Sequence, residues 1–143
     1  MNPQSLSLFL LRLALSFIWL SAGLSKLFDR QFINNFPNTI GNFAKASHFY
    51  FYTDFLNQYV IPNSEVFAQL SVWGEILTGV AFLIGFPMVL GALVGIFLNL
   101  NYFLIATQPP SQFLNILMIF SQLVAYTNDA GCTWGMCSFI KKK

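Results

Sequence analysis

The sequence predicts an all-α integral membrane protein, a bundle of four transmembrane helices. The composition carries this prediction, because 56% of the 143 residues are hydrophobic and only 8% are charged, whereas an ordinary soluble domain is about 25% charged. Residues 76–128 also contain no Asp, Glu, Lys or Arg. A soluble chain of this length buries only about two-thirds of the surface that its unfolded form exposes, so it could not remove this much apolar surface from water.

Turns divide the apolar sequence into spans. A helix needs about 20 apolar residues to cross roughly 30 Å of hydrocarbon, so residues 76–128 hold more than one span. Prolines predict turns at 85–87 and 108–111, because proline lacks an N–H and disfavours helix in the residue before it. Arg12 lies inside the first apolar run and no Lys or Arg precedes it, unlike a signal peptide, so this run is expected to remain as a helix. The predicted spans, all in one domain of residues 1–143, are 5–28, 66–86, 88–107 and 111–127.

A long aromatic loop, residues 29–64, joins the first two spans. Phe and Tyr make up half of residues 48–59, and aromatic side chains gather at the membrane–water interface. We therefore predict that residues 46–60 form a short helix or turn on the interface, covering one mouth of the bundle. A loop packed on its own helices is the alternative. Four spans place both termini on one side, and the three lysines at 141–143 slightly favour the cytoplasm for that side.

Each predicted span carries one face of polar or small residues, and the four faces can meet in a common interior. Ionisable groups inside a span are costly and are therefore candidate functional groups. The residues of these faces are Arg12, Ser16, Trp19, Gly23 and Lys26 on the first span, Ser71, Glu75 and Thr78 on the second, Gly91, Gly95, Asn99 and Tyr102 on the third, and Asn115, Gln122 and Tyr126 on the fourth.

The depth of the charged residues predicts a pairing. A rise of 1.5 Å per residue places Glu75 near the middle of the membrane and Arg12 about 5 Å away along an antiparallel neighbour. We therefore predict an Arg12–Glu75 ion pair, with hydrogen bonds from Asn99 or Gln122. Lys26 is expected near the loop-side mouth, where its ammonium can reach water. One interpretation of the pair is structural, since a buried ion pair can fix the register of helices.

The second interpretation is functional, because a polar slot inside apolar walls suits a quinone head group. Such a head group needs hydrogen-bond donors for two carbonyl oxygens and, on reduction, a source of protons, a role predicted for Glu75. The alternative functions are a non-catalytic membrane anchor or assembly subunit, and a small-solute carrier. The predicted cofactor-binding residues are Arg12, Trp19, Lys26, Glu75, Asn99 and Gln122.

Three local patterns resemble one family of membrane proteins. Arg12-Leu13 lies near the start of the first span, and Gly23-Leu24-Ser25-Lys26 closes it. Glu75 lies in the second span, and Ala130-Gly131-Cys132-Thr133-Trp134-Gly135-Met136 follows the fourth. In this order the motifs resemble the DoxX/DoxD family of four-helix membrane proteins, whose members typically show R-L, G-x-x-K, a Glu and a closing A-G-R-x-x-G-x-D. The resemblance extends over nearly the whole chain.

The resemblance also implies a function. DoxD-type members are the membrane subunit of a thiosulfate:quinone oxidoreductase, and some other members are membrane partners of soluble thiol or sulfur enzymes. The chain is therefore expected to be a DoxX-like subunit of a quinone-linked redox or sulfur-oxidising system. Its expected partners are membrane lipid and either a partner protein or a second copy of the chain. Cys132 and Cys137 depart from the family pattern, since they stand where the closing motif has Arg and Asp.

Cys132 and Cys137, in the tail 128–143, are candidate catalytic residues together with Glu75. Their spacing allows a redox-active disulfide if the neighbouring glycines bend the segment. Two free thiols are the alternative, and they are expected if the termini are cytoplasmic. No metal site is predicted, because two Cys and a lone His48, taken as an ordinary interfacial residue, supply too few ligands. A net charge of +2 gives no basic field for nucleic acid.

Overall fold

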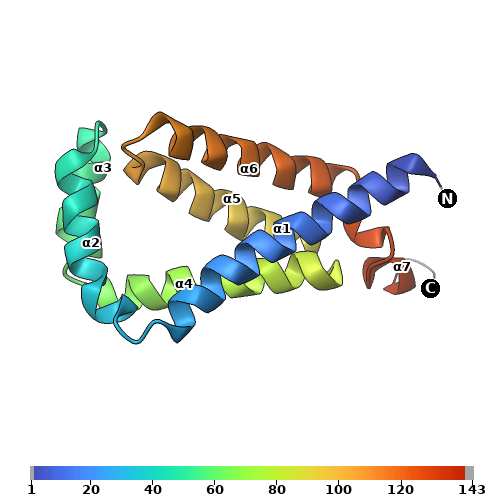
Figure 1. Cartoon of the computed structure of the whole chain (residues 1–143), viewed down its shortest axis with the longest axis horizontal. Coiled ribbons are helices and arrows are strands. Elements are labelled where there is room, and N and C mark those ends of the chain that lie inside the picture. Colours follow the sequence, from blue (N-terminus) through green and yellow to red (C-terminus); the bar gives the residue numbers. More distant parts are fainter. Residues whose placement is uncertain (1, 141–143) are drawn as a thin grey trace.

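The computed structural model describes residues 2–140, and these residues form helices and turns without a strand. Four long helices pack into a bundle, and shorter helices close its two ends (Figure 1). The long helices are α1 (Pro3–Phe28), α4 (Ser64–Ile84), α5 (Met88–Ile105) and α6 (Pro109–Thr127). The shorter elements are α2 (Phe32–Ala46), α3 (Tyr50–Phe55), the π-helical turn η1 (Leu56–Val60), the 3₁₀ turn η2 (Ala130–Cys132) and α7 (Cys137–Ile140).

The bundle has two distinct ends. Figure 1 shows α2 and α3 lying across one end, whereas the start of α1 and the helix α7 lie at the other. We refer to α2, α3 and η1 together as the cap, and to the end that holds η2 and α7 as the terminal end. The three lysines at 141–143, on which the predicted orientation partly rests, lie outside the described residues.

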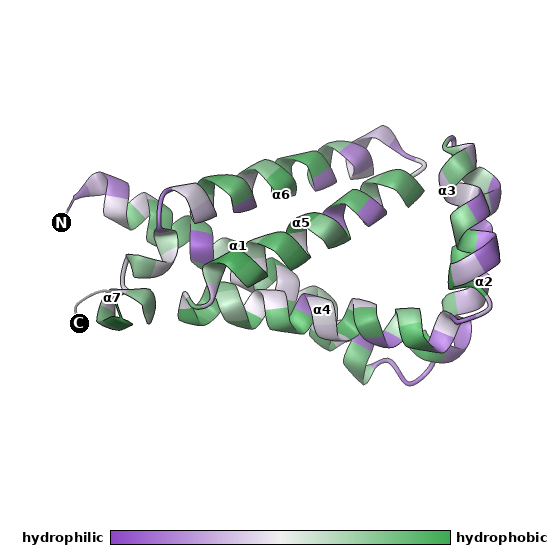
Figure 2. Ribbon diagram, turned by 180° about the vertical axis from the view of Figure 1, so that it is seen from behind, coloured by the Kyte–Doolittle hydropathy of each residue, from purple (hydrophilic) through white to green (hydrophobic). Residues whose placement is uncertain are grey.

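Three helices, α1, α4 and α5, are long and apolar enough to cross a membrane. A fourth helix, α6, forms at the predicted place and packs against α5, but Gln112, Asn115 and Gln122 make it less apolar. The four-helix bundle is therefore confirmed, whereas the count of four apolar spans is not exact. Figure 2 shows hydrophobic residues along all four long helices and more hydrophilic residues on α2. Large side chains on the outer face, such as Phe17 (73% exposed) and Phe97 (64%), suit hydrocarbon as their solvent.

The cap is more helical than the predicted loop at 29–64. Phe36, Ile40 and Ala44 recur every fourth residue along α2 and turn one apolar face inward. That face packs against Tyr52 and other residues of α3 and η1 in a small hydrophobic cluster. Because each short helix can bury one side in this way, the aromatic segment folds as a layer of helices across the bundle end.

Two hydrogen bonds fasten the cap to α5. The Tyr52 hydroxyl donates to Asn101 Oδ1 at 2.5 Å, and the Ser47 hydroxyl donates to the Leu104 carbonyl at 3.3 Å. Burial raises the pKa of Tyr52 to about 12, so its hydroxyl keeps the proton that it donates. The cap is therefore held to the same helix that carries Tyr102, the residue that directly follows Asn101.

Two glycines allow α1 and α4 to approach closely. A Cβ added to Gly79 would lie 2.7 Å from Leu20 Cγ and 2.8 Å from the Leu20 backbone nitrogen. A Cβ added to Gly23 would lie 2.7 Å from Ile76 Cγ1 and 3.1 Å from Glu75 Cβ. Small residues let helix backbones meet in this way inside membranes. These contacts fix the antiparallel register, in which Gly23 is level with Glu75.

Gly79→Ala is expected to lower the free energy of unfolding by about 1–3 kcal/mol, the usual result of overpacking. The added methyl group would meet the Leu20 backbone, which cannot move aside as a side chain can. Gly41→Ala in α2 is the matched control, since the nearest atom to its added Cβ is Ile61 Cδ1 at 4.0 Å. This control should be neutral or stabilising, because Gly is less favourable than Ala inside a helix. Unfolding in detergent micelles measures both, and equal effects would contradict the packing described here.

Candidate functional site

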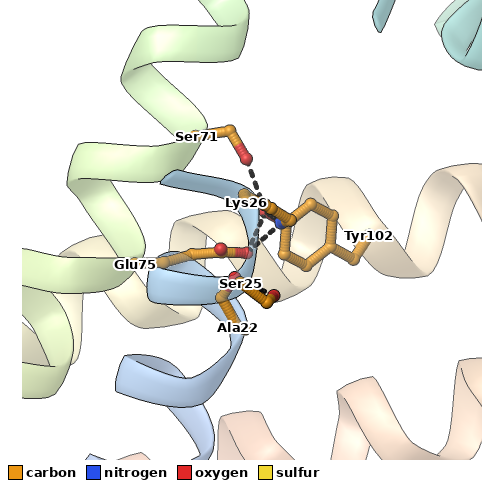
Figure 3. A network of polar contacts seen from close by, with 6 residues as sticks. All are labelled: Ala22, Ser25, Lys26, Ser71, Glu75 and Tyr102. Carbon is orange, nitrogen blue, oxygen red and sulfur yellow. Dashed lines mark hydrogen bonds and ion pairs between the residues drawn. The ribbon is translucent and has the colours of Figure 1, made fainter. Parts of the chain in front are cut away.

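Four side chains from three helices form a polar network near the cap (Figure 3). Lys26 Nζ of α1 donates to Glu75 Oε1 of α4 at 2.5 Å, forming an ion pair. The Tyr102 hydroxyl of α5 donates to the same carboxylate oxygen at 2.6 Å. Tyr102 also accepts a hydrogen bond from Lys26 at 3.2 Å and lies 2.8 Å from the Ser71 hydroxyl. Since the single phenolic proton points to Glu75, Ser71 is the donor in that last contact.

The network neutralises a deeply buried charge. Glu75 is 1% exposed, whereas the Lys26 side chain is 25% exposed and reaches toward the bundle mouth. The Lys26 ammonium also lies 5.1 Å from the centre of the Tyr102 ring and 5.7 Å from that of Phe32, within the range of cation–π attraction. A buried carboxylate is thus held by one cation and one phenol, and the cation itself is partly exposed.

The predicted Arg12–Glu75 ion pair is wrong, because the carboxylate pairs with Lys26 instead. The glycine contacts place Gly23 beside Glu75, and Arg12 precedes Gly23 by eleven residues on α1. At 1.5 Å per residue, this separation amounts to about 16 Å along the helix. The depth estimate measured Glu75 and Arg12 from opposite membrane surfaces and took both predicted spans to fill the same thickness, whereas the close contacts of α1 with α4 set a different register.

Arg12 is instead buried at the terminal end, with 1% of its surface exposed. One of its nitrogens, Nη2, donates to the Trp134 carbonyl at 3.4 Å. A Cβ added to Gly85 or to Gly135 would collide with Nη1, so the guanidinium packs directly on the backbone there. Gly85 caps the C-terminus of α4 in a left-handed conformation, and the carbonyls at a helix C-terminus favour a cation. Arg12 therefore ties α1 to the end of α4 and to the turn at Trp134.

The other predicted ligand residues lie between these two groups. Trp19, Asn99 and Gln122 are all buried, as predicted for residues that face the interior. Neither Asn99 nor Gln122 hydrogen-bonds to Glu75, and Gln122 Nε2 donates to the Met118 carbonyl of its own helix at 2.9 Å.

Several buried polar atoms have no protein partner in the described part of the chain: Arg12 Nε and Nη1, Trp19 Nε1, Glu75 Oε2, Thr78 Oγ1, Asn99 Nδ2 and Gln122 Oε1.

A cavity of about 460 Å³ lies between the cap, α4 and α5. Its walls are mostly aromatic and aliphatic, and its polar lining comes from Ser71, Tyr102, Tyr52 and Asn101. Glu75 and Lys26 are not among the lining residues; they lie one hydrogen bond behind Tyr102.

The cavity opens sideways between α4 and α5. Leu70, Trp73 and Leu77 of α4 line it and are 60%, 49% and 63% exposed, and Phe97 of α5 lines it and is 64% exposed. In a membrane these side chains face lipid. An amphiphile can therefore enter from the bilayer without passing through water.

Sequence analysis missed Ser71 and Tyr102 as site residues, although it placed both on the inward faces. The signal that could have found them is helical spacing. Ser71 precedes Glu75 by four residues, one helical turn, and Tyr102 continues the Gly91–Gly95 face of its helix. The cavity itself depends on the cap, of which α3 and η1 lie in the short helix or turn predicted at 46–60, whereas α2 was not predicted.

Cys132 and Cys137 form a disulfide bond at the terminal end. Both are half-buried, and the bond resolves the two alternatives left by their spacing. The disulfide lies near Gly85 and Arg12, about 15 Å along α4 from Glu75 at 1.5 Å per residue. The three predicted catalytic residues therefore fall into two separate groups. His48 lies in the link between α2 and α3, and no group of three metal-ligating side chains occurs among the described residues.

These features define a multi-pass helical membrane protein with a charged network buried beside a lipid-facing cavity. The DoxX family model matches residues 7–108, which is most of the chain, so the protein belongs to the DoxX family. The matched segment includes Lys26, Glu75 and Tyr102, whereas the segment with the two cysteines lies outside it. No curated protein and no solved structure matches the chain.

Proposed function

We propose that this DoxX protein binds a quinone head group in the cavity between the cap, α4 and α5, as the membrane subunit of a quinone-linked redox or sulfur-oxidising system. The observation that carries the proposal is the combination of apolar walls, a lipid-facing opening and three hydroxyl groups, those of Tyr52, Ser71 and Tyr102, on the lining residues. Pockets for small ligands typically combine apolar walls with a few polar groups that orient the ligand. The isoprenoid tail would lie between Leu77 and Phe97, toward the bilayer.

The network supplies a proton route for this chemistry. Reduction of a quinone to a quinol takes two electrons and two protons. On quinone binding, the hydroxyl of Tyr102 would turn its proton from Glu75, and that of Ser71 would turn its proton from Tyr102, toward a quinone carbonyl oxygen. A proton that leaves Tyr102 would be replaced from Lys26, which already donates to the Tyr102 oxygen at 3.2 Å. Lys26 is 25% exposed and can recover its proton from water. Glu75 holds Lys26 and Tyr102 in place, and the electrons come from a partner protein.

The proposal changes the roles of several predicted residues. Lys26 and Glu75 keep their place in the quinone site, with Ser71 and Tyr102 added. Arg12, Trp19, Asn99 and Gln122 do not line the cavity, so they are no longer proposed as direct ligands. Cys132 and Cys137 are proposed as a separate thiol–disulfide pair that a partner protein reaches at the terminal end.

A second candidate function is a membrane anchor or assembly subunit without catalytic activity. The outer face of the cap favours it, since Tyr50, Phe51 and Tyr59 are 84%, 67% and 58% exposed. Aromatic residues are enriched both at membrane interfaces and at protein–protein interfaces. In this alternative the cap contacts a partner protein, and the Lys26–Glu75 pair only holds α1 and α4 together.

Quinone binding can be measured through the fluorescence of Trp73, which lines the cavity. In a Trp19→Phe/Trp134→Phe protein in micelles, decylubiquinone should quench the Trp73 fluorescence with a saturable dependence on its concentration. Gly74→Leu should abolish the saturable quenching, because it fills the cavity. Tyr102→Phe should weaken binding about fivefold, since one lost hydrogen bond amounts to about 1 kcal/mol.

The control for cavity filling is Leu114→Phe, which enlarges a side chain on the outer face of α6 that is 62% exposed. It should quench as the parent protein does. Linear quenching of the same size in all variants would mean that decylubiquinone only partitions into the micelle. That result would contradict the quinone site and favour the anchor.

The disulfide also indicates which side of the membrane the terminal end faces. Disulfides persist in oxidising compartments and are rare in the cytosol. We propose that the terminal end faces an oxidising compartment, in place of the cytoplasmic side that the balance of Lys and Arg favours. In intact cells, an impermeant reductant followed by an impermeant maleimide should then label Cys132 and Cys137. A cysteine-free chain with Asn38→Cys in the cap should label only after lysis, and the reverse pattern would reject this orientation.

A further inference from the structure

A second polar layer lies one helical turn from the Lys26–Glu75 network, toward the terminal end. It consists of Trp19, Thr78, Asn99 and Gln122, one residue from each long helix. Each is at most 3% exposed, and each has a side-chain nitrogen or oxygen without a protein partner. The second carboxylate oxygen of Glu75, Oε2, also has none.

The helix contacts bring these side chains together. Thr78 follows Glu75 by one turn on α4, and Trp19 precedes Gly23, which contacts Glu75, by one turn on α1. A Cβ added to Gly95 would lie 3.0 Å from Thr78 Cγ2 and would collide with Gln122 Oε1. Gln122 and Thr78 are therefore neighbours across α5.

Asn99 completes the layer from α5. It follows Gly95 by one turn and precedes Tyr102 by three residues, so it joins the level of Gly95 and Gln122 to that of the network. The four helices thus direct their unpaired polar groups toward one level of the bundle interior, next to Glu75.

The unpaired atoms include both hydrogen-bond donors and hydrogen-bond acceptors. Trp19 Nε1 and Asn99 Nδ2 are donors, Gln122 Oε1 and Glu75 Oε2 are acceptors, and the Thr78 hydroxyl is both. Buried polar groups in a membrane find no partner in the lipid, so leaving them unpaired is strongly unfavourable. Water both donates and accepts, and a buried water typically makes about three hydrogen bonds.

We propose that ordered water is bound inside the bundle among Trp19, Thr78, Asn99 and Gln122, with Glu75 Oε2 as a further partner. This site is separate from the cavity and does not depend on quinone binding. An apolar layer divides it from Arg12, since Leu15, Phe82 and Ala130 pack together there. The bound water would hydrate the side of Glu75 that Lys26 and Tyr102 leave free.

X-ray radiolytic footprinting tests the proposal on the intact chain in lipid nanodiscs. Hydroxyl radicals form at bound water, so in H₂¹⁸O the Trp19 indole should acquire ¹⁸O although it is only 3% exposed. Phe82, which is 0% exposed in the apolar layer, is the internal control and should stay unmodified. Labelling of Trp19 should fall to the level of Phe82 in an Asn99→Leu/Gln122→Leu protein. Trp19 labelling no higher than that of Phe82 in the parent protein would overturn the proposal.

Thr78→Val provides an independent test, because the expected change in melting temperature has one sign if the layer binds water and the opposite sign if the layer is dry. If water is bound, this nearly isosteric change removes one of its partners and lowers the melting temperature. If the layer is dry, the change removes an unpaired hydroxyl and raises the melting temperature, which would also overturn the proposal. Thr127→Val is the matched control, because Thr127 is exposed and its hydroxyl donates to the Leu123 carbonyl of its own helix.

Discussion

The close approach of α1 and α4 at Gly23 and Gly79 determines where the charged groups of this protein meet. Because neither glycine carries a side chain, the two backbones pack tightly enough for the Ser16 hydroxyl to donate to the Gly79 carbonyl at 2.9 Å. The register that results brings Lys26 to Glu75 and carries Arg12 to the far end of α4. A shift of one turn would leave a buried carboxylate without a cation in the membrane interior, which is strongly unfavourable.

The paired charges in turn organise the rest of the interior. Tyr102 binds the Glu75 carboxylate and so links α5 to the α1–α4 pair. Tyr52 and Asn101 hold the cap over the same end, which leaves a cavity above the phenol that opens to lipid. The charged network thus extends from the partly exposed Lys26 to the apolar cavity, the arrangement on which the proposed quinone site depends. The proposed site would explain why so apolar a chain keeps Lys26 and Glu75 in its interior.

The sequence predicted the helices and their inward faces better than the contacts between them. Composition and turns located all four long helices, and helical spacing placed Lys26, Glu75 and Tyr102 on inward faces. The partner of Glu75 could not be predicted, since depth along one helix does not give the register between two, which depends on close contacts at Gly23 and Gly79. A short helix or turn was predicted at 46–60, where α3 and η1 lie, but α2 was missed because it is stabilised by packing against those elements. The cysteine pairing likewise depended on how the turn after α6 folds.

A double-mutant cycle on Glu75 tests the central claim most directly. The register described here predicts that Lys26→Met and Glu75→Gln are coupled by about 0.5–3 kcal/mol in the free energy of unfolding, as expected for residues in contact. Arg12→Met and Glu75→Gln should be additive within about 0.5 kcal/mol, as expected for distant residues. Coupling of Glu75 to Arg12, with additivity toward Lys26, would contradict the register and the site built on it.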